Sequence, residues 1–239
     1  MEKSEYEMMF KEEKNHWWFI GRRRIILFFI KKIYNSRKNL NILDFGCGTG
    51  FNMLFLRNFG KIDGIDISEE SLKFCKKRGI NIDILDVTKD KIKKYINKYD
   101  LITVLDVLEH TEDDELVLKK LYSFLKGNGH IIITVPAFKF LSSNHDIILH
   151  HKRRYDKKDL IRKIKTSVLC VEFISYYNCF LLPFAILRKI INPKESSLKI
   201  TATKHKKIFD LLYNAETFLL SRKLIPVGVS IFCIVKKIG

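Results

Sequence analysis

Short apolar runs alternate with longer amphipathic segments through the middle of this 239-residue chain. Apolar runs of about four to eight residues between turn residues are typical of buried strands, whereas apolar positions at about every third or fourth residue are typical of helices. Strands are predicted near residues 41–45, 61–66, 80–85, 100–105 and 129–135. Helices are predicted between them, near residues 50–59, 69–79, 88–97 and 113–126. This alternation predicts a parallel α/β sheet, doubly wound with right-handed crossovers, in which ligands bind at the carboxyl ends of the strands.

The sequence before and after this core predicts additions to it. Three parts are expected: an N-terminal helical cap at 1–40, the core with a substrate loop at 41–165, and a C-terminal part at 166–239. Strands expected near 168–177 and 227–235 bring the sheet to seven strands, mostly parallel, with helices on both faces. A basic and apolar insertion, residues 179–225, is expected between these last two strands.

A glycine-rich turn follows the first predicted strand. Residues 41–50 read Asn-Ile-Leu-Asp-Phe-Gly-Cys-Gly-Thr-Gly, so Asp44 precedes glycines at positions 46, 48 and 50. Glycine lets the backbone turn sharply and approach a ligand that a Cβ would exclude. A carboxylate beside the turn suits a ligand with an ammonium group and disfavours the pyrophosphate of a dinucleotide. Asp66 follows Gly46 by 20 residues and ends the next predicted strand, where it could accept the hydroxyls of a ribose.

Carboxylates also follow the third and fourth predicted strands. Asp86 is flanked by Leu85 and Val87, and its carboxylate with a neighbouring amide could bind the edge of an adenine. Asp106 begins the sequence Asp-Val-Leu-Glu-His, which ends at His110. Because the carboxyl ends of parallel strands share one edge of a sheet, we expect these acids to lie beside the glycine turn.

Together these residues resemble motifs I to V of the class I S-adenosylmethionine-dependent methyltransferases, in which D-x-G-x-G-x-G is the signature of motif I. The resemblance covers about residues 41–136. It implies a Rossmann-like fold, S-adenosylmethionine as the cofactor and methyl transfer as the activity. It also implies that Asp44 and the glycines hold the amino-acid end of the cofactor, that Asp66 holds the ribose, and that residues 105 and 106 border the transferring methyl. The cofactor-binding residues that it implies are Asp44, Phe45, Gly46, Cys47, Gly48, Gly50, Asp66, Ile67, Asp86, Val87, Leu105 and Asp106.

Histidines and arginines are concentrated in the loop after the fifth predicted strand, which leaves the sheet on the cofactor side. His145 is a candidate general base, and Asp146 and His110 are the other candidate catalytic residues. Arg153 and Arg154 could bind a phosphate or carboxylate, or could instead pair with acids such as Asp146 and order the loop. A metal site built from the histidines of this loop is not predicted. Their spacing matches neither a helix nor a strand, and the neighbouring cationic side chains oppose a cation.

Two segments resemble a narrower group of methyltransferase-domain proteins that occur with enzymes of cell-surface polysaccharides and glycolipids. One is His-Trp-Trp-Phe at residues 16–19, followed by three arginines at 22–24, and the other is His-Lys-Arg-Arg-Tyr at 151–155. The two tryptophans could form a lid over the cofactor, anchor the chain at an interface or pack on the sheet. The candidate acceptor-binding residues are Trp17, Trp18, Arg22, His151, Arg153, Arg154 and Tyr155.

The formal net charge of +17 is concentrated in the C-terminal part, where residues 151–239 carry 19 Lys and Arg against 6 Asp and Glu. Such a field favours anionic partners, namely a membrane surface, a phosphorylated lipid or nucleic acid. The apolar run at 180–191 is shorter than the roughly 18 residues that a membrane span requires. With its basic neighbours it could lie at a membrane interface, cover an acceptor pocket or seal a dimer.

Methyl transfer from a sulfonium depends mainly on alignment and exclusion of water, and a base matters when the acceptor is a hydroxyl or a protonated amine. We expect a methyltransferase acting on an oxygen of a small-molecule, lipid-linked, glycan or quinone-like acceptor near a membrane surface. Nucleic-acid methylation is the less favoured alternative, because the fourth strand does not end in Asn/Asp-Pro-Pro-aromatic and the chain has no Pro-Cys pair. A further alternative, a binding protein without chemistry, is disfavoured by the intact glycine signature.

The cysteines and the N-terminal residues bear on location. Five scattered cysteines form no C-x-x-C pair, and the first residues are acidic without an apolar signal region. These features predict a reducing, cytoplasmic location, with peripheral contact at the inner face of the membrane.

Overall fold

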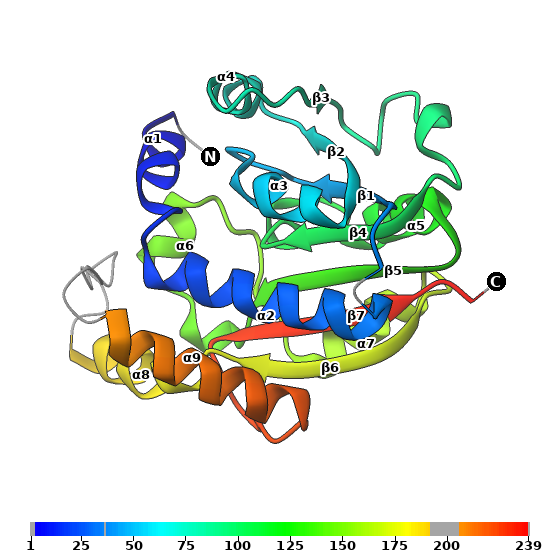
Figure 1. Cartoon of the computed structure of the whole chain (residues 1–239). Coiled ribbons are helices and arrows are strands. Elements are labelled where there is room, and N and C mark those ends of the chain that lie inside the picture. The colour runs from blue at the N-terminus through cyan, green and yellow to red at the C-terminus, as the bar shows by residue number, and fades with distance from the viewer. Residues whose placement is uncertain (1–2, 36, 192–205, 239) are drawn as a thin grey trace.

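A seven-stranded sheet organises the molecule (Figure 1). The computed structural model describes residues 3–35, 37–191 and 206–238. The strands follow the order β3-β2-β1-β4-β5-β7-β6, and all neighbours are parallel except β7, which is antiparallel to β5 and to β6. The strands are β1 (Leu40–Phe45), β2 (Gly60–Asp66), β3 (Asp83–Ile84), β4 (Tyr99–Leu105), β5 (Leu125–Pro136), β6 (Cys170–Tyr177) and β7 (Ser230–Lys236). The predicted seven-stranded, mostly parallel α/β sheet is confirmed.

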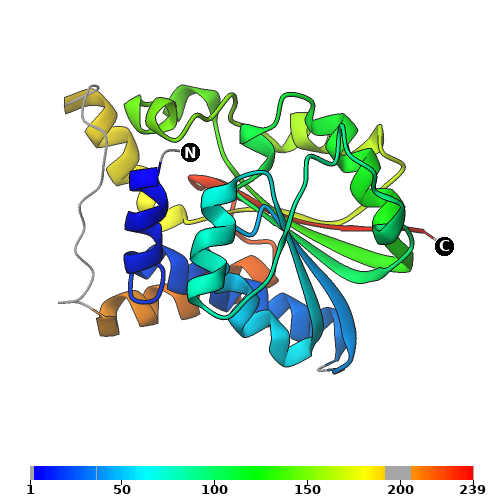
Figure 2. The same ribbon diagram turned by 90° about the horizontal axis from the view of Figure 1, so that it is seen from above.

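Helices cover both faces of this sheet (Figures 1 and 2). Helices α2 and α3 lie on one face, α5 and α7 lie on the other, and α9 packs beside α2. The helices are α1 (Lys3–Glu12), α2 (Trp17–Tyr34), α3 (Phe51–Leu56), α4 (Glu69–Lys77), α5 (Asp114–Phe124), α6 (Asn144–Ile148), α7 (Lys157–Lys165), α8 (Leu182–Ile191) and α9 (Lys206–Ser221).

The central strands are buried on both sides, which explains their nearly continuous apolar sequence. In β1 and β4 all but one residue of each strand is buried. Asp44 and Thr103 are polar exceptions that pair across these strands, and the Thr103 hydroxyl donates to the Asp44 carboxylate at 2.7 Å. The carboxyl ends of β1, β2 and β4 therefore meet at one edge, and this edge carries the glycine turn.

The crossover between β3 and β4 differs from the prediction. The helix predicted near 88–97 is wrong, because the structure has only a 3₁₀ turn there, Lys93–Tyr95, and the predicted strand 80–85 is reduced to two residues. The Asp86 carboxylate accepts hydrogen bonds from the Thr88 amide at 2.9 Å and hydroxyl at 2.6 Å. Such local side-chain bonds compete with helix formation, which gives a physical reason for the turn.

The segments outside the core follow the predicted plan with shifted boundaries. Helix α2 starts at Trp17, because the His16 Nδ1 caps it by accepting the Trp18 amide at 3.3 Å. Helices α8 and α9 form within the predicted insertion, of which residues 192–205 lie outside the described part. In the described residues, no helix combines the length and the apolar character needed to cross a bilayer.

Candidate functional site

The glycine turn is held over the end of β2 by its own backbone. The amides of Gly46 and Cys47 donate to the Ile65 carbonyl at 2.8 and 3.1 Å. Gly46 has a φ of +70°, and a Cβ there would lie 2.4 Å from a methyl of Val107. Side chains are therefore excluded from this position both by backbone conformation and by close approach.

Asp66 connects the turn to the end of β2. Its carboxylate accepts the Gly48 amide at 2.9 Å and the Ser68 amide at 3.0 Å, and the residue is buried. Burial raises the pKa of Asp66, while these hydrogen bonds oppose the rise. Each carboxylate oxygen has lone pairs beyond its one amide bond, so the group can accept further hydroxyl donors.

Asp44 has a buried oxygen without a donor. Thr103 donates to one of its oxygens, whereas the other has no hydrogen-bond partner among the described residues. Burial raises the pKa of Asp44 to about 7, and the Thr103 hydrogen bond and the nearby Arg22 oppose the rise. A buried acceptor in this condition suits a ligand that supplies a cationic donor.

The other predicted cofactor residues lie along the same strand ends. Asp86 is half-buried and also pairs with Lys89 at 3.3 Å, while Ile67, beside Asp66, is 69% exposed. The remaining apolar members are buried, namely Phe45, Cys47, Val87 and Leu105. The structure thus gathers the predicted set at one edge, and its role in cofactor binding stays a prediction.

Helix α1 lies against the glycine turn, and the sequence analysis missed it. Glu13, which follows α1, accepts hydrogen bonds from the Thr49 hydroxyl and from Arg78. Arg78 also donates to the Thr49 carbonyl at 3.0 Å, and a Cβ on Gly48 would lie 2.9 Å from the Met9 methyl. The available signal was the spacing of aromatic and methionine residues three and four apart among the N-terminal acids.

The buried Arg22 forms an ion pair with the partly exposed Asp106 at the end of β4. The Arg22 guanidinium pairs with one carboxylate oxygen of Asp106, and the Thr134 hydroxyl donates to the other at 2.9 Å. Asp106 has a φ of +57°, so the chain turns sharply as it leaves the strand. Arg22 was predicted to bind the acceptor, and the structure brings it to the predicted cofactor residue Asp106.

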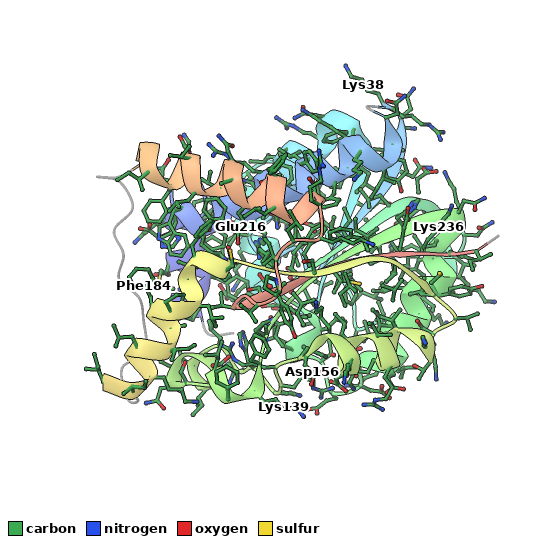
Figure 3. All side chains as sticks on the ribbon, turned by 90° about the horizontal axis from the view of Figure 1, so that it is seen from below. Lys38, Lys139, Asp156, Phe184, Glu216 and Lys236 are labelled. Carbon is green, nitrogen blue, oxygen red and sulfur yellow. The ribbon has the colours of Figure 1, made fainter. Side chains whose placement is uncertain are left out.

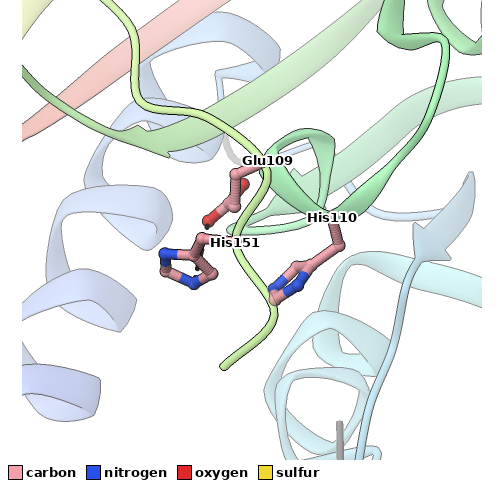
Figure 4. A group of neighbouring side chains, drawn as sticks. All are labelled: Glu109, His110 and His151. Carbon is pink, nitrogen blue, oxygen red and sulfur yellow. Dashed lines mark ion pairs between the residues drawn. The ribbon is translucent and has the colours of Figure 1, made fainter. Parts of the chain in front are cut away.

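A cluster of one acid and two histidines, Glu109, His110 and His151, follows this turn (Figure 4). Glu109 is fully buried, and among the described residues neither of its carboxylate oxygens has a hydrogen-bond partner. The His151 Nε2 lies 4.0 Å from the Glu109 Oε1, and the two imidazole rings meet edge to face with centroids 4.8 Å apart. Burial and the neighbouring His151 lower the pKa of His110 to about 4.

Asp146 orients this cluster. Its carboxylate lies 2.8 Å from the His151 Nδ1 and accepts two hydrogen bonds from Arg154, at 2.9 and 3.1 Å. Burial opposes ionisation of Asp146, but the His151 and Arg154 hydrogen bonds hold its pKa well below the usual range. The predicted catalytic residues His110 and Asp146 are thus brought together through His151, whereas the His145 side chain lies outside the described residues. Glu109 was missed, and its signal was an acid between apolar residues and a histidine.

Three of the predicted acceptor-binding residues have structural partners within the protein. Tyr155 is fully buried and donates to Asp114 at 2.8 Å, so we correct its assignment from the acceptor to the core. Arg153 pairs with Asp114 at 3.1 Å, and Arg154 pairs with Asp146. The alternative in which these arginines order the loop is the one that the structure shows.

The tryptophans pack against the insertion. Trp17 is buried and stacks on Phe209 of α9 with ring centroids 5.3 Å apart, and Trp18 packs against this pair. Trp17 also lines a small hollow of about 20 Å³, which is bordered by Tyr213 and Glu216. Packing is therefore shown for Trp17, and contact of the tryptophans with the acceptor stays a prediction.

Comparisons with known proteins agree with this geometry. A family model described as a methyltransferase domain matches residues 36–193. A ubiquinone biosynthesis O-methyltransferase of Rickettsia canadensis is 33% identical over 116 residues, which cover 45% of this chain and 48% of that protein. This chain thus spans about half the length of that curated relative.

Solved structures share the fold. A methyltransferase from Archaeoglobus fulgidus, described as S-adenosylmethionine-dependent, superposes with a TM-score of 0.58 at 20% identity, covering 90% of this chain and 94% of that chain. Phosphoethanolamine N-methyltransferase 2 of Haemonchus contortus, in complex with S-adenosylmethionine, gives a TM-score of 0.61 at 16% identity, covering 89% and 52%.

Proposed function

The chain belongs to the methyltransferase-domain family, and from this premise we propose that it methylates a hydroxyl oxygen of a small quinone-like or phenolic acceptor. It is an enzyme that uses S-adenosylmethionine. The sulfonium of that cofactor, when bound, supplies an electrophilic methyl group. In such a transfer the acceptor oxygen would bond to the methyl carbon, the electron pair of the carbon–sulfur bond would stay on sulfur, and the hydroxyl proton would pass to a neighbouring base or to solvent.

The residues at the strand ends fit this cofactor. The free oxygen of Asp44 suits its ammonium group, and the Asp66 carboxylate can accept the ribose hydroxyls. A Cβ at Gly46 would collide with Val107, so only glycine lets the turn pack this closely against the residues after β4. We propose that Asp44 binds the amino-acid end, that Asp66 binds the ribose and that Asp86 lies at the adenine.

The observation that carries the choice of an oxygen acceptor is the cluster of Glu109, His110 and His151 directly after β4. A hydroxyl is a weak nucleophile until its proton is removed, so O-methylation gains from groups that receive or promote loss of that proton. The cluster lies beyond Asp106, the residue predicted to border the transferring methyl. The name of the Rickettsia canadensis relative supports an oxygen acceptor of quinone type.

The test is methyl transfer by the purified chain to a catechol-type phenol, with phosphoethanolamine as the amine comparison. We expect transfer to the phenol, with the activity strongly reduced in Glu109→Gln. The matched control is His130→Asn, because His130 lies in the middle of β5, six residues before the carboxyl end of the strand, and pairs with Glu172 at 3.0 Å. Transfer to the amine alone, or to neither acceptor by a chain that binds S-adenosylhomocysteine, would overturn the proposal.

We also propose peripheral membrane contact through α8. Exposed apolar side chains gather on this helix, and Figure 3 shows Phe184 at the edge of the molecule. The members exposed on α8 are Phe184, Ile186, Leu187, Ile190 and Ile191. Binding to vesicles containing anionic lipid should weaken in Ile190→Asp but not in the control Ile84→Asp, because Ile84 is an exposed residue of β3. Equal binding by both variants would contradict the proposal, and strongly salt-dependent RNA binding would favour a nucleic-acid acceptor.

A further inference from the structure

We propose that Glu109, His110 and His151 bind one divalent first-row metal ion of the Zn²⁺, Fe²⁺ or Mn²⁺ type, with coordination positions left open. The expectation from sequence was that the histidines of the loop after β5 form no metal site. The structure combines only one of them, His151, with two residues from the end of β4. The metal site stands on its own geometry, and only its use in catalysis rests on the proposed function.

The three side chains converge from two segments (Figure 4). Glu109 and His110 belong to the 3₁₀ turn Leu108–His110, and His151 comes from the loop before Tyr155. One ligand atom from each residue lies within 4.8 Å of the other two. Ligand atoms at about 2.1 Å from a shared ion lie roughly 3 to 4 Å apart, so side-chain movements of about 1 Å would close the site.

The burial of Glu109 is a second observation, separate from the convergence of the three side chains, that indicates a ligand at this position. Its carboxylate is fully buried, and both oxygens lack hydrogen-bond partners among the described residues. A buried carboxylate without a donor is costly unless a cation or a hydrogen bond compensates it. The two neighbouring arginines do not fill this role, because Arg22 pairs with Asp106 and Arg154 pairs with Asp146. Glu109 is therefore the acid of the cluster whose two carboxylate oxygens have neither an arginine nor a hydrogen-bonding partner among the described residues.

Asp146 prepares His151 to act as a ligand. An ionised carboxylate only accepts hydrogen bonds, so the His151 Nδ1, 2.8 Å away, is the donor and Nε2 is left free toward Glu109. Histidines that bind metals ordinarily donate their other ring N–H to a carboxylate or a carbonyl in this way. Arg154 and the Ser143 amide, which donates to Asp146 at 2.8 Å, fix the carboxylate in turn.

The donor set indicates the class of ion and its use. Imidazoles with one carboxylate suit first-row transition metals and zinc better than Mg²⁺ or Ca²⁺, which prefer oxygen ligands. Three protein ligands leave positions for water or substrate, as in catalytic rather than structural sites. An ion here would favour loss of the acceptor hydroxyl proton to solvent, so no side chain of the cluster would need to act as the base.

The experiment is metal binding by the untagged full chain after treatment with a chelator. Equilibrium dialysis with Zn²⁺ and Mn²⁺ should give one bound ion per chain, and Co²⁺ should add a visible absorption band typical of nitrogen ligation. Glu109→Gln and His151→Asn should each weaken binding by at least tenfold, and Asp146→Asn, a positioning variant, by about tenfold to a hundredfold. His130→Asn is the control and should bind as the wild type does.

The outcomes separate this proposal from the proposed function. Absence of a stoichiometric ion in the folded wild type, or equal binding by Glu109→Gln, would overturn the metal site. Phenol methylation that persists in excess chelator would also overturn its catalytic role while leaving the O-methyltransferase intact. A bound ion in a chain that methylates no phenol would support the site and refute the proposed acceptor. Circular dichroism of each variant shows whether a lost ion reflects a lost ligand or a lost fold.

Discussion

Without ligand, the Asp44→Asn variant should become more stable relative to the wild type as the pH rises. Burial raises the pKa of this carboxyl to about 7 from its usual value of 3.8. A group whose pKa is higher in the folded state stabilises the fold fully below its unfolded pKa, and this contribution is lost as the pH rises toward the folded pKa. The wild type therefore loses stability from Asp44 between about pH 4 and pH 7, and Asp44→Asn does not.

The size of the effect follows from the two pKa values. With one pKa unit equal to about 1.4 kcal/mol, the difference in unfolding free energy between Asp44→Asn and wild type should increase by about 2.5 kcal/mol from pH 5 to pH 8. The Asn amide group faces a position without an acceptor, which costs about 1–3 kcal/mol. This cost is the same at both pH values and cancels from the comparison.

Urea unfolding of both proteins at pH 5 and pH 8 measures this difference, and other titrating groups cancel between them. Calorimetric titration with S-adenosylhomocysteine measures how ligand affinity depends on the same carboxylate. Wild-type affinity should increase from pH 5.5 to pH 7.5 as Asp44 ionises, and Asp44→Asn should bind weakly at both. A stability difference that does not change between pH 5 and pH 8 would refute the raised pKa. Unimpaired binding by the variant would refute contact between Asp44 and the ammonium group.

Three further substitutions test the site. Asp66→Asn should weaken S-adenosylhomocysteine binding about tenfold or more by calorimetry, because charge-assisted hydrogen bonds become neutral ones, and an unchanged Kd would remove Asp66 from the cofactor site. Gly46→Ala should lower the unfolding free energy, measured with urea, by more than about 3 kcal/mol, because its Cβ would lie 2.4 Å from a neighbouring side chain. The control Gly79→Ala has a similar φ of +69° but open space around it, and should lower the unfolding free energy by about 1 kcal/mol. Equal losses of unfolding free energy in the two variants would mean that the backbone conformation alone, and not the close neighbour, determines the effect. Arg22→Met should lower the unfolding free energy by about 1–3 kcal/mol, because it leaves the partly exposed Asp106 carboxylate with Thr134 as its remaining partner. An unchanged unfolding free energy would show that solvent screens the pair.

The N-terminal helix α1 connects the start of the chain to the glycine turn of the predicted cofactor site. Glu13 contacts both Thr49 in the glycine turn and Arg78 after α4, so α1 is attached to the two elements that border the turn. Arg78 also donates to the Phe10 carbonyl at 3.3 Å. The arrangement places residues from the start of the chain beside the predicted cofactor residues, which were drawn from residues 44 to 106.

The sequence by itself determined the sheet and the edge at which the predicted cofactor residues gather, because both follow from local sequence patterns. Strands with continuous apolar runs must be buried, and a turn that places Gly46 at positive φ favours glycine. The helix predicted after β3 was wrong, and the cause is also local. The Asp86 side chain accepts a hydrogen bond from the Thr88 amide, and this bond competes with helix formation.

Only the tertiary structure decided which polar side chains meet. Glu109 and His151 are 42 residues apart, and their proximity depends on how the chain leaves β4 and returns after β5. The same folding commits Tyr155 to the core and turns Arg154 toward Asp146, against the predicted contact with the acceptor. The type of a residue determines which hydrogen bonds and ion pairs its side chain can form. Which partner it meets depends on long-range packing, so a local sequence motif does not reveal that partner.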